Sequence, residues 1–173
     1  MNIELHVYTA DNKSKIHANI ERMSHADALS TISPDMPWQT SWLSDFISDE
    51  NKEKYSLKTD DGELLALVAY EIVEDKLFVE IAYMESQPES NPTISSAKKY
   101  FGIGKALIAY GVVLSVNRGC YGAVVLQAKT SELAKHYAED FNAMQIPSFG
   151  GAPRFLIEGN AAMEILSDYI LCD

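Results

Sequence analysis

Residues 99–117 constrain the fold of this chain more than any other stretch. A short loop that contains Gly102 and Gly104 leads there directly into an apolar pattern at helical spacing. Residues 77–84 before the loop and residues 123–128 after the helix have the composition of strands. This strand, helix, strand order predicts a right-handed crossover between two strands that are parallel and either adjacent or separated by one neighbour.

The start of this helix is a candidate phosphate site, because the first turn of a helix presents backbone N–H groups at its positive end. A dinucleotide-binding loop would need glycine or alanine where the chain has Leu107, and a P-loop would need serine or threonine at Ala106. An acyl-CoA loop of the form Gln/Arg-x-x-Gly-x-Gly/Ala fits residues 99–104 except at Lys99. A glycine-containing helix start without a ligand is the remaining interpretation.

Upstream of this loop, the pattern predicts two helices and a meander of antiparallel strands. Residues 3–9 alternate in polarity and are expected to form a first strand. Asp11 or Asn12 is expected to cap the first helix, and the second follows a loop at residues 33–37. Their apolar faces are assigned to Ile16, Ile20 and Met23 in the first helix, and to Trp38, Trp42, Phe46 and Ile47 in the second. Strands are predicted over residues 55–59, 64–73 and 76–84, with turns at residues 60–62 and 74–75.

The remainder of the chain is predicted to alternate helices and strands. Residues 85–98 lack periodicity and are expected to form a loop, and residues 117–119 end the glycine-loop helix. Thr130 or Ser131 is expected to cap a helix that buries Leu133, Tyr137 and Phe141. A turn region over residues 147–153, a strand over 154–158 and a helix over 160–171 follow. Because no repeat or linker divides the chain, we expect a single domain over residues 1–173.

Composition narrows the class of protein. An apolar content of 47% over 173 residues is that of a globular chain, and the net charge of −11 disfavours nucleic acid or an anionic membrane as a partner. The two cysteines form no CxxC and no cluster with histidine, so we expect no metal site. The sequence contains no signal-peptide pattern and no membrane span, and a cytoplasmic location is the default expectation.

Residues 64–158 resemble the GNAT superfamily of acetyl-CoA-dependent N-acetyltransferases. The resemblance rests on the meander, the Gly102/Gly104 loop, the strand at residues 123–128 and the following helix with Tyr137; residues 79–83 and 98–107 look like matching motifs. It implies an α+β (α/β three-layer) fold with a central mixed, mostly antiparallel sheet of about six to seven strands flanked by helices. The fourth and fifth strands would splay apart and hold acetyl-CoA in the gap.

The same resemblance implies a set of cofactor-binding residues. Backbone N–H groups of the loop would hold the CoA pyrophosphate, and Lys99 would replace the usual glutamine or arginine. The end of the fourth strand would hydrogen-bond the pantetheine arm like an added strand, and Ser131 stands where the family commonly has a capping asparagine. The implied residues are Tyr83, Met84, Ser86, Lys99, Tyr100, Phe101, Gly102, Ile103, Gly104, Lys105 and Ser131.

Two residues are implied to be catalytic. Tyr137 falls where many members place a tyrosine that protonates the leaving thiolate, and a core role beside its apolar neighbours is the alternative. Glu80 falls at the strand position of a glutamate base, and a surface glutamate is the alternative. Glu85 is the fallback base.

The function implied by the resemblance is transfer of acetyl from acetyl-CoA to a primary amine by direct attack. The acidic charge favours a cationic acceptor, either a small molecule or a protein or peptide amine. Two alternatives stay open: a catalytically silent acyl-CoA-binding sensor or interaction module with the same fold, and a nucleotide-binding regulatory domain. Members of the family often dimerise, so a homodimer is a further expectation.

Overall fold

The computed structural model describes residues 2–45, 47, 51–72, 75 and 77–171. The chain forms two compact units. The first unit comprises Met1–Ile3, Tyr70–Ala82 and Ile108–Asp173, and the second comprises Glu4–Ala69 and Tyr83–Leu107. The prediction of one domain over residues 1–173 stays a prediction.

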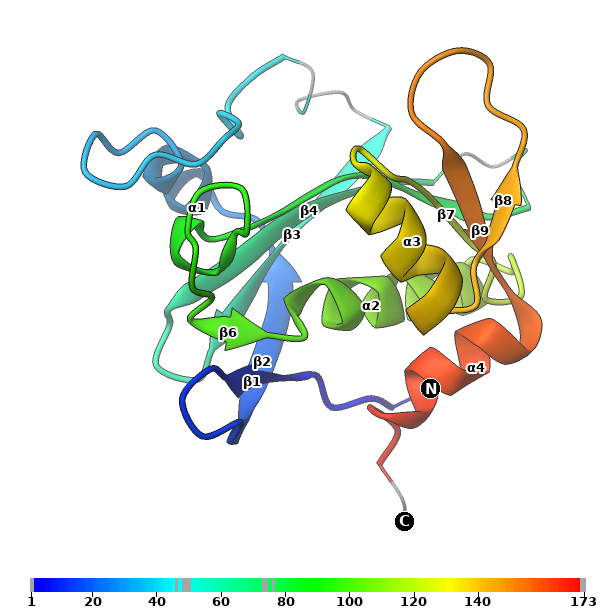
Figure 1. The fold of residues 1–173 in the computed structure, drawn as a ribbon, viewed down its shortest axis with the longest axis horizontal. Coiled ribbons are helices and arrows are strands. Elements are labelled where there is room, and N and C mark those ends of the chain that lie inside the picture. Colours follow the sequence, from blue (N-terminus) through cyan, green and yellow to red (C-terminus); the bar gives the residue numbers. More distant parts are fainter. Residues whose placement is uncertain (1, 46, 48–50, 73–74, 76, 172–173) are drawn as a thin grey trace. The chain divides into compact units, whose positions relative to one another are not determined.

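The fold is α+β, as predicted, with helices beside a mixed sheet (Figure 1). In the described part of the chain nine strands follow the hydrogen-bonded order β6-β1-β2-β3-β4-β5-β7-β9-β8. The resemblance implied about six to seven strands, and the structure has more because β2, β6 and β8 were not predicted as strands. The strands are β1 (His6–Thr9), β2 (Lys15–Arg22), β3 (Lys52–Thr59), β4 (Leu64–Glu71), β5 (Val79–Ser86), β6 (Tyr100–Phe101), β7 (Val124–Gln127), β8 (Met144–Ile146) and β9 (Arg154–Ile157).

The predicted first helix is wrong, because residues 15–22 form strand β2 in the second unit. β2 pairs antiparallel with β1 on one side and with β3 on the other. Ile16 and Ile20 are spaced by four residues, which fits a helical face, but with Ala18 between them they also alternate as a strand requires. Asp11 and Asn12 lie in the turn between β1 and β2 and cap no helix.

The predicted second helix is also wrong. The helix of this region is the short α1 (His25–Ser30), whose cap Ser24 accepts the N–H of Asp27 and donates its own N–H to the Asp27 carboxylate in a capping box. Described residues after position 31 form turns and bends up to β3. Trp42 and Ile47 are nevertheless buried in the core of this unit with Ala28, Leu67 and Ala69, while Phe46 lies outside the described residues.

The meander that follows agrees with the prediction. The turn between β3 and β4 is closed by hydrogen bonds from Gly62 N–H to Thr59 O and from Thr59 N–H to Glu63 O, both 3.0 Å. Gly62 has a φ of +90°, which only glycine adopts readily. The parts of the predicted strands at Val73 and Lys76, and the turn residue Glu74, lie outside the described residues. Residues 87–98 form a loop that includes the 3-10 helix η1 (Pro88–Ser90), whereas Glu85 and Ser86 of the predicted loop belong to β5.

The predicted crossover of strand, helix and strand is present. β5 and β7 are parallel neighbours, joined in sequence by α2 (Ile103–Asn117). β7 pairs antiparallel with β9, and β9 with β8. The helices α3 (Ser131–Asp140) and α4 (Gly159–Ser167) belong to the first unit. α4 ends at Ser167, although the predicted helix extended to residue 171.

Alternation along these strands separates two faces of the sheet. Val79, Ile81, Val124, Phe155 and Ile157 are buried and share one face. α3 packs on this face, since the ring of Tyr137 contacts that of Phe155 (Figure 1). α2 packs on the same face, since a Cβ at Gly111 would lie 3.7 Å from Val124 Cγ2. Glu80, Val125 and Arg154 share the opposite face. None of the described helices is long and apolar enough to cross a membrane.

Candidate functional site

The glycine loop and the start of α2 have the geometry of an anion site. Strand β6 pairs with β1 and ends at Phe101, Gly102 follows with a φ of +85°, and α2 begins at Ile103. The hydrogen bond from Ala106 N–H to Gly102 O, 3.0 Å, opens the helix. The N–H groups of the first turn therefore point out of the end of the helix, where an α-helix offers no acceptor of its own.

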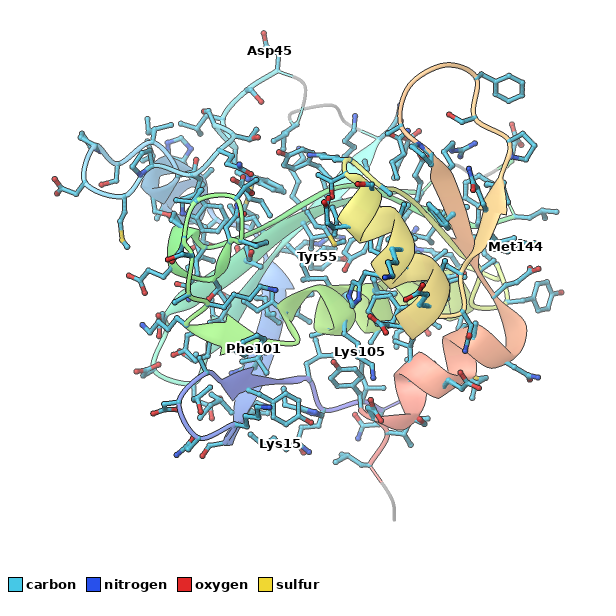
Figure 2. The ribbon with its side chains drawn as sticks, viewed as in Figure 1. Lys15, Asp45, Tyr55, Phe101, Lys105 and Met144 are labelled. Carbon is cyan, nitrogen blue, oxygen red and sulfur yellow. The ribbon has the colours of Figure 1, made fainter. Side chains whose placement is uncertain are left out.

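Space beside the first turn of α2 is open at Gly104. A Cβ built at Gly104 would meet no heavy atom within 4 Å, so neither packing nor an unusual φ requires glycine at this position. An uncovered helix start without a side chain permits close approach of a ligand to the backbone. Lys105, the next residue along the helix, adds a positive charge to the same turn (Figure 2).

Lys99 and Tyr100 are bound by a residue that the sequence did not indicate. Glu63, immediately after the β3–β4 turn, accepts a hydrogen bond from Lys99 Nζ at 2.5 Å and one from the Tyr100 hydroxyl at 2.7 Å. Glu89 Oε2 lies 3.4 Å from the same Nζ. Burial raises the pKa of Glu63, but the hydrogen bonds from Lys99 and Tyr100 outweigh burial and leave the pKa below its ordinary value.

Backbone hydrogen bonds fix the same segment. Lys99 donates its N–H to Glu89 O at 2.9 Å and accepts the N–H of Ala10 at 3.0 Å. Tyr100 donates its N–H to the hydroxyl of the buried Ser90 at 3.1 Å. The strand that leads into the glycine loop is thus held on both edges by main-chain contacts.

The second half of β5 carries three of the predicted cofactor-binding residues. Tyr83, Met84 and Ser86 are half-buried in the second unit. The Tyr83 hydroxyl lies 2.6 Å from Thr40 Oγ1, and its ring is 5.5 Å from that of Trp42 in an edge arrangement. These contacts connect the strand to the turn-rich segment before β3.

Glu85 connects the same two segments. It is 5% exposed, and its two oxygens accept the N–H of Gln39 at 2.6 Å and the indole N–H of Trp42 at 3.1 Å. A buried carboxylate with two such donors stabilises the local fold. These contacts favour a structural role over that of the fallback base.

Tyr137 lies on α3 in the first unit and is 2% exposed. Its ring stacks on Phe141 at a centroid distance of 6.4 Å and meets Phe155 edge-on at 5.9 Å. Burial raises the pKa of Tyr137 to about 12. Within the described residues, the Tyr137 hydroxyl is not left both buried and without a hydrogen-bond partner. The side chain is therefore part of the core and also a phenol that stays protonated at neutral pH.

The cap of α3 is Thr130, one of the two predicted candidates. The Thr130 hydroxyl accepts the N–H of Leu133 at 3.2 Å. Ser131 is the first helical residue, and its hydroxyl donates to Glu132 at 3.3 Å. The capping position assigned by the resemblance to Ser131 thus lies one residue earlier.

Glu80 lies on the opposite face of the β5–β7–β9 sheet from Tyr137. Its Oε2 is 3.8 Å from Arg154 Nη2, and the two side chains are only 15% and 21% exposed. The same guanidinium lies 6.0 Å from the ring centroid of Phe78. Registered pairing between β5 and β7 covers Val79–Ile81 and, within the described residues, ends there, although β5 continues to Ser86.

Known structures share this architecture. Spermidine N-acetyltransferase from Vibrio cholerae, solved with CoA and spermine, aligns at 13% identity and a TM-score of 0.59 over 84% of this chain and 98% of that one. Nourseothricin acetyltransferase aligns at 14% identity and a TM-score of 0.54 over 81% of this chain and 97% of that one. The chain has the GNAT fold. No protein-family model matches the sequence, and no curated protein matches it.

Two residues that contact predicted site residues of this GNAT fold were not identified from the sequence. Arg154 was assigned only to a strand, yet its charge is opposite to that of Glu80 on a nearby strand, and this could have suggested the pair. Glu63 carried no signal, because its partners Lys99 and Tyr100 follow more than thirty positions later. The structure groups the predicted loop residues in the second unit and places Glu80 and Tyr137 in the first.

Proposed function

We propose that this protein is an N-acetyltransferase that moves acetyl from acetyl-CoA to a primary amine by direct attack. The observation that carries the proposal is the start of α2, where Gly102 in the left-handed region and the open Gly104 leave the backbone accessible in a GNAT fold. The residues present fit CoA, because a helix start with adjacent lysines suits a pyrophosphate. Acetyl-CoA supplies the reactive thioester.

Backbone groups would position the thioester. The first turn of α2, with Lys105, would bind the pyrophosphate, and the strand N–H near Met84 would donate to the carbonyl oxygen as negative charge develops there. Tyr83 to Ser86 would hydrogen-bond the pantetheine arm as an added strand. Lys99 would act indirectly, because its ammonium is bound to Glu63 and Glu89.

Tyr137 and Glu80 would divide the proton transfers. With a pKa of about 12 the Tyr137 phenol stays protonated at neutral pH, and it would donate to the leaving thiolate. Glu80, directly or through a water, would accept the proton that the amine loses. The two residues lie on opposite faces of the β5–β7–β9 sheet.

We infer a cationic acceptor. The chain has a net charge of −11, which attracts cationic molecules and raises their encounter rate. One structural neighbour was solved with spermine, so a polyamine is the first molecule to test, followed by a basic peptide.

A silent acyl-CoA sensor is the second candidate, and one observation favours it. Arg154 lies 3.8 Å from the carboxylate of Glu80 and would compete with an amine for it. A sensor with the same fold would keep the CoA contacts and lose turnover.

A thiol-release assay across a panel of amines separates the two candidates. An enzyme is expected to release CoA with at least one amine and to lose turnover by about 10²–10⁴-fold in Tyr137→Phe and by a comparable factor in Glu80→Gln. Lys135→Ala, an exposed change on α3, serves as the matched control. CoA binding in calorimetry without turnover would establish the sensor, and binding of ATP without binding of CoA would refute both.

A further inference from the structure

A charge pair in the first unit lies on the sheet face opposite α2 and α3, close to the point where two strands stop pairing. Glu80 of β5 and Arg154 of β9 project from this face, and Glu80 Oε2 lies 3.8 Å from Arg154 Nη2. Within the described residues, the registered pairing of β5 with β7 ends at Ile81, one residue after Glu80. The pair is therefore placed where a ligand could reach the sheet between these strands.

Both members of the pair are largely withdrawn from solvent. Their side chains are only 15% and 21% exposed. The Arg154 guanidinium also lies 6.0 Å from the ring centroid of Phe78, which is half-buried. At such low exposure each charge has lost much of its hydration, and an opposite charge is what compensates that loss. A ligand that engages Glu80 must therefore leave Arg154 with an anionic partner.

An exposed amide lies beside Arg154 on the same face. Gln127 of β7 is the direct cross-strand partner of Arg154, so the two side chains project to the same side of the sheet. A planar guanidinium with an amide N–H next to it suits a carboxylate, whereas the carboxylate of Glu80 suits an ammonium. The face thus offers donors for a carboxylate next to an acceptor for an amine.

An α-amino acid carries the matching pair of charges. Its nitrogen and its nearer carboxylate oxygen are about 3 Å apart, given standard backbone bond lengths and angles, and Glu80 and Arg154 are 3.8 Å apart. With its ammonium facing Glu80 and its carboxylate facing Arg154, the four charges alternate and neither side chain is left uncompensated. An amine without a carboxylate would instead bring a second cation next to Arg154, which would continue to compete for Glu80.

We propose that the acceptor is an α-amino acid whose carboxylate is bound by Arg154 with the help of Gln127, and whose α-amine is acetylated. The inference rests on the proposed function and narrows its acceptor. A basic amino acid such as lysine also keeps the net positive charge that a chain of net charge −11 attracts. Arg154 is then a specificity-determining residue and not only a competitor for Glu80.

The proton balance follows from the bound form of the acceptor. The ammonium loses one proton to water, and the resulting amine bonds to the acetyl carbon as the bond from that carbon to sulfur breaks. Glu80 takes the second proton of the nitrogen, and Tyr137 gives one to the leaving thiolate. The products are an N-acetyl amino acid and CoA, and proton exchange with water restores both residues.

A thiol-release assay tests the proposal with the protein amino acids, their methyl esters, cadaverine and putrescine. Cadaverine and putrescine are lysine and ornithine without the carboxylate, and a methyl ester keeps the α-amine but removes the negative charge. For the best amino acid, the wild-type protein is expected to show a kcat/KM about tenfold above that of its methyl ester and of either diamine, since one charge-assisted contact is lost. Mass spectrometry of the product should place the acetyl group on the α-nitrogen.

Substitutions of Arg154 assign the preference to this residue. Arg154→Gln is expected to remove the preference for the amino acid over its methyl ester. Arg154→Lys keeps the charge without the planar fork and is expected to retain part of the preference. Arg118→Gln, the same change at an exposed arginine just after α2 in the first unit, is the matched control and should leave the preference unchanged. Melting temperatures show whether each variant is folded.

Contrary outcomes separate this proposal from the proposed function. Equal kcat/KM for an amino acid and its methyl ester, turnover confined to amines without a carboxylate, or a preference that survives Arg154→Gln overturns the proposal and leaves the proposed function standing. Absence of turnover with every amine tested overturns both.

Discussion

Replacing Glu63 is expected to loosen the segment that leads into the glycine loop. Glu63 binds Lys99 through one carboxylate oxygen and the Tyr100 hydroxyl through the other. Glu63→Gln keeps an acceptor for Tyr100 but removes the negative charge, whereas Glu63→Ala removes both contacts. The alanine variant should therefore lose more stability than the glutamine variant, because it also removes the acceptor of the Tyr100 hydrogen bond.

The expected magnitude follows from exposure. The side chains of Glu63 and Lys99 are 29% and 46% exposed, so solvent screens the ion pair, and its loss in Glu63→Gln should cost about 0.5–1 kcal/mol. The hydrogen bond from Tyr100 to a charged acceptor adds about 1–1.5 kcal/mol, which brings Glu63→Ala to about 2 kcal/mol. For a chain of this size, each kcal/mol lowers the melting temperature by about 2–4 °C.

Chemical denaturation at several pH values provides the assay. Because folding lowers the pKa of Glu63, its contribution is present above the ordinary value of 4.5 and is lost as the pH falls through the lowered pKa. Because folding raises the pKa of Lys99, chiefly through Glu63, the same contribution persists below 10.5 and is lost as the pH rises through the raised pKa. The wild-type protein and Glu63→Gln should therefore differ at pH 7 and converge in strong acid.

A double-mutant cycle with Lys99→Met decides whether the ion pair is responsible. The coupling energy between the two substitutions should be about 0.5–1 kcal/mol at pH 7 and should shrink at high salt. Additive effects, or a stability difference that does not change with pH, would refute the reasoning. CoA affinity gives a second readout, because a displaced loop should bind CoA more weakly.

Three further predictions concern the site. Tyr137→Phe should lower kcat by about 10²–10⁴-fold. Because the pKa of Tyr137 is raised to about 12, the wild-type tyrosine should cause no alkaline loss of activity below pH 10. An unchanged kcat in Tyr137→Phe would exclude its role as the acid. Gly102→Ala should cost about 1–2 kcal/mol of stability because of the positive φ of Gly102. Gly104→Ala should preserve the melting temperature and weaken CoA binding. Equal melting temperatures of the Gly102→Ala and Gly104→Ala variants would contradict this prediction. Glu85→Ala should cost about 3 kcal/mol and change the fluorescence of Trp42, which a solvent-exposed carboxylate would not do.

The parts of the fold that the sequence predicted are those in which one pattern had one interpretation. The glycine loop followed by a long apolar helix led to α2 and to the parallel pair of β5 and β7. The turn at residues 60–62 contained Gly62 at a position that needs a positive φ. The turn signal depends on backbone sterics and needs no knowledge of tertiary contacts.

The errors arose where tertiary contacts decided the outcome. Ile16 and Ile20 fit both periods, and pairing with β1 and β3 selected the strand. Trp42 is spaced like a helical core residue, but it lies in a turn-rich segment. It is buried there, and its indole N–H donates a hydrogen bond to Glu85. Lys99 was expected to bind the cofactor, and its binding by Glu63 depends on a residue distant in sequence.

The pairing of β1 with β6 has a kinetic consequence. β1 and β2 form a local hairpin, whereas Tyr8 and Phe101 are separated by about ninety residues, so closing the second pair costs more loop-closure entropy. We expect the glycine loop to reach its final conformation late in refolding, after the hairpin. Ligand-binding competence should then lag behind the recovery of secondary structure in a stopped-flow experiment.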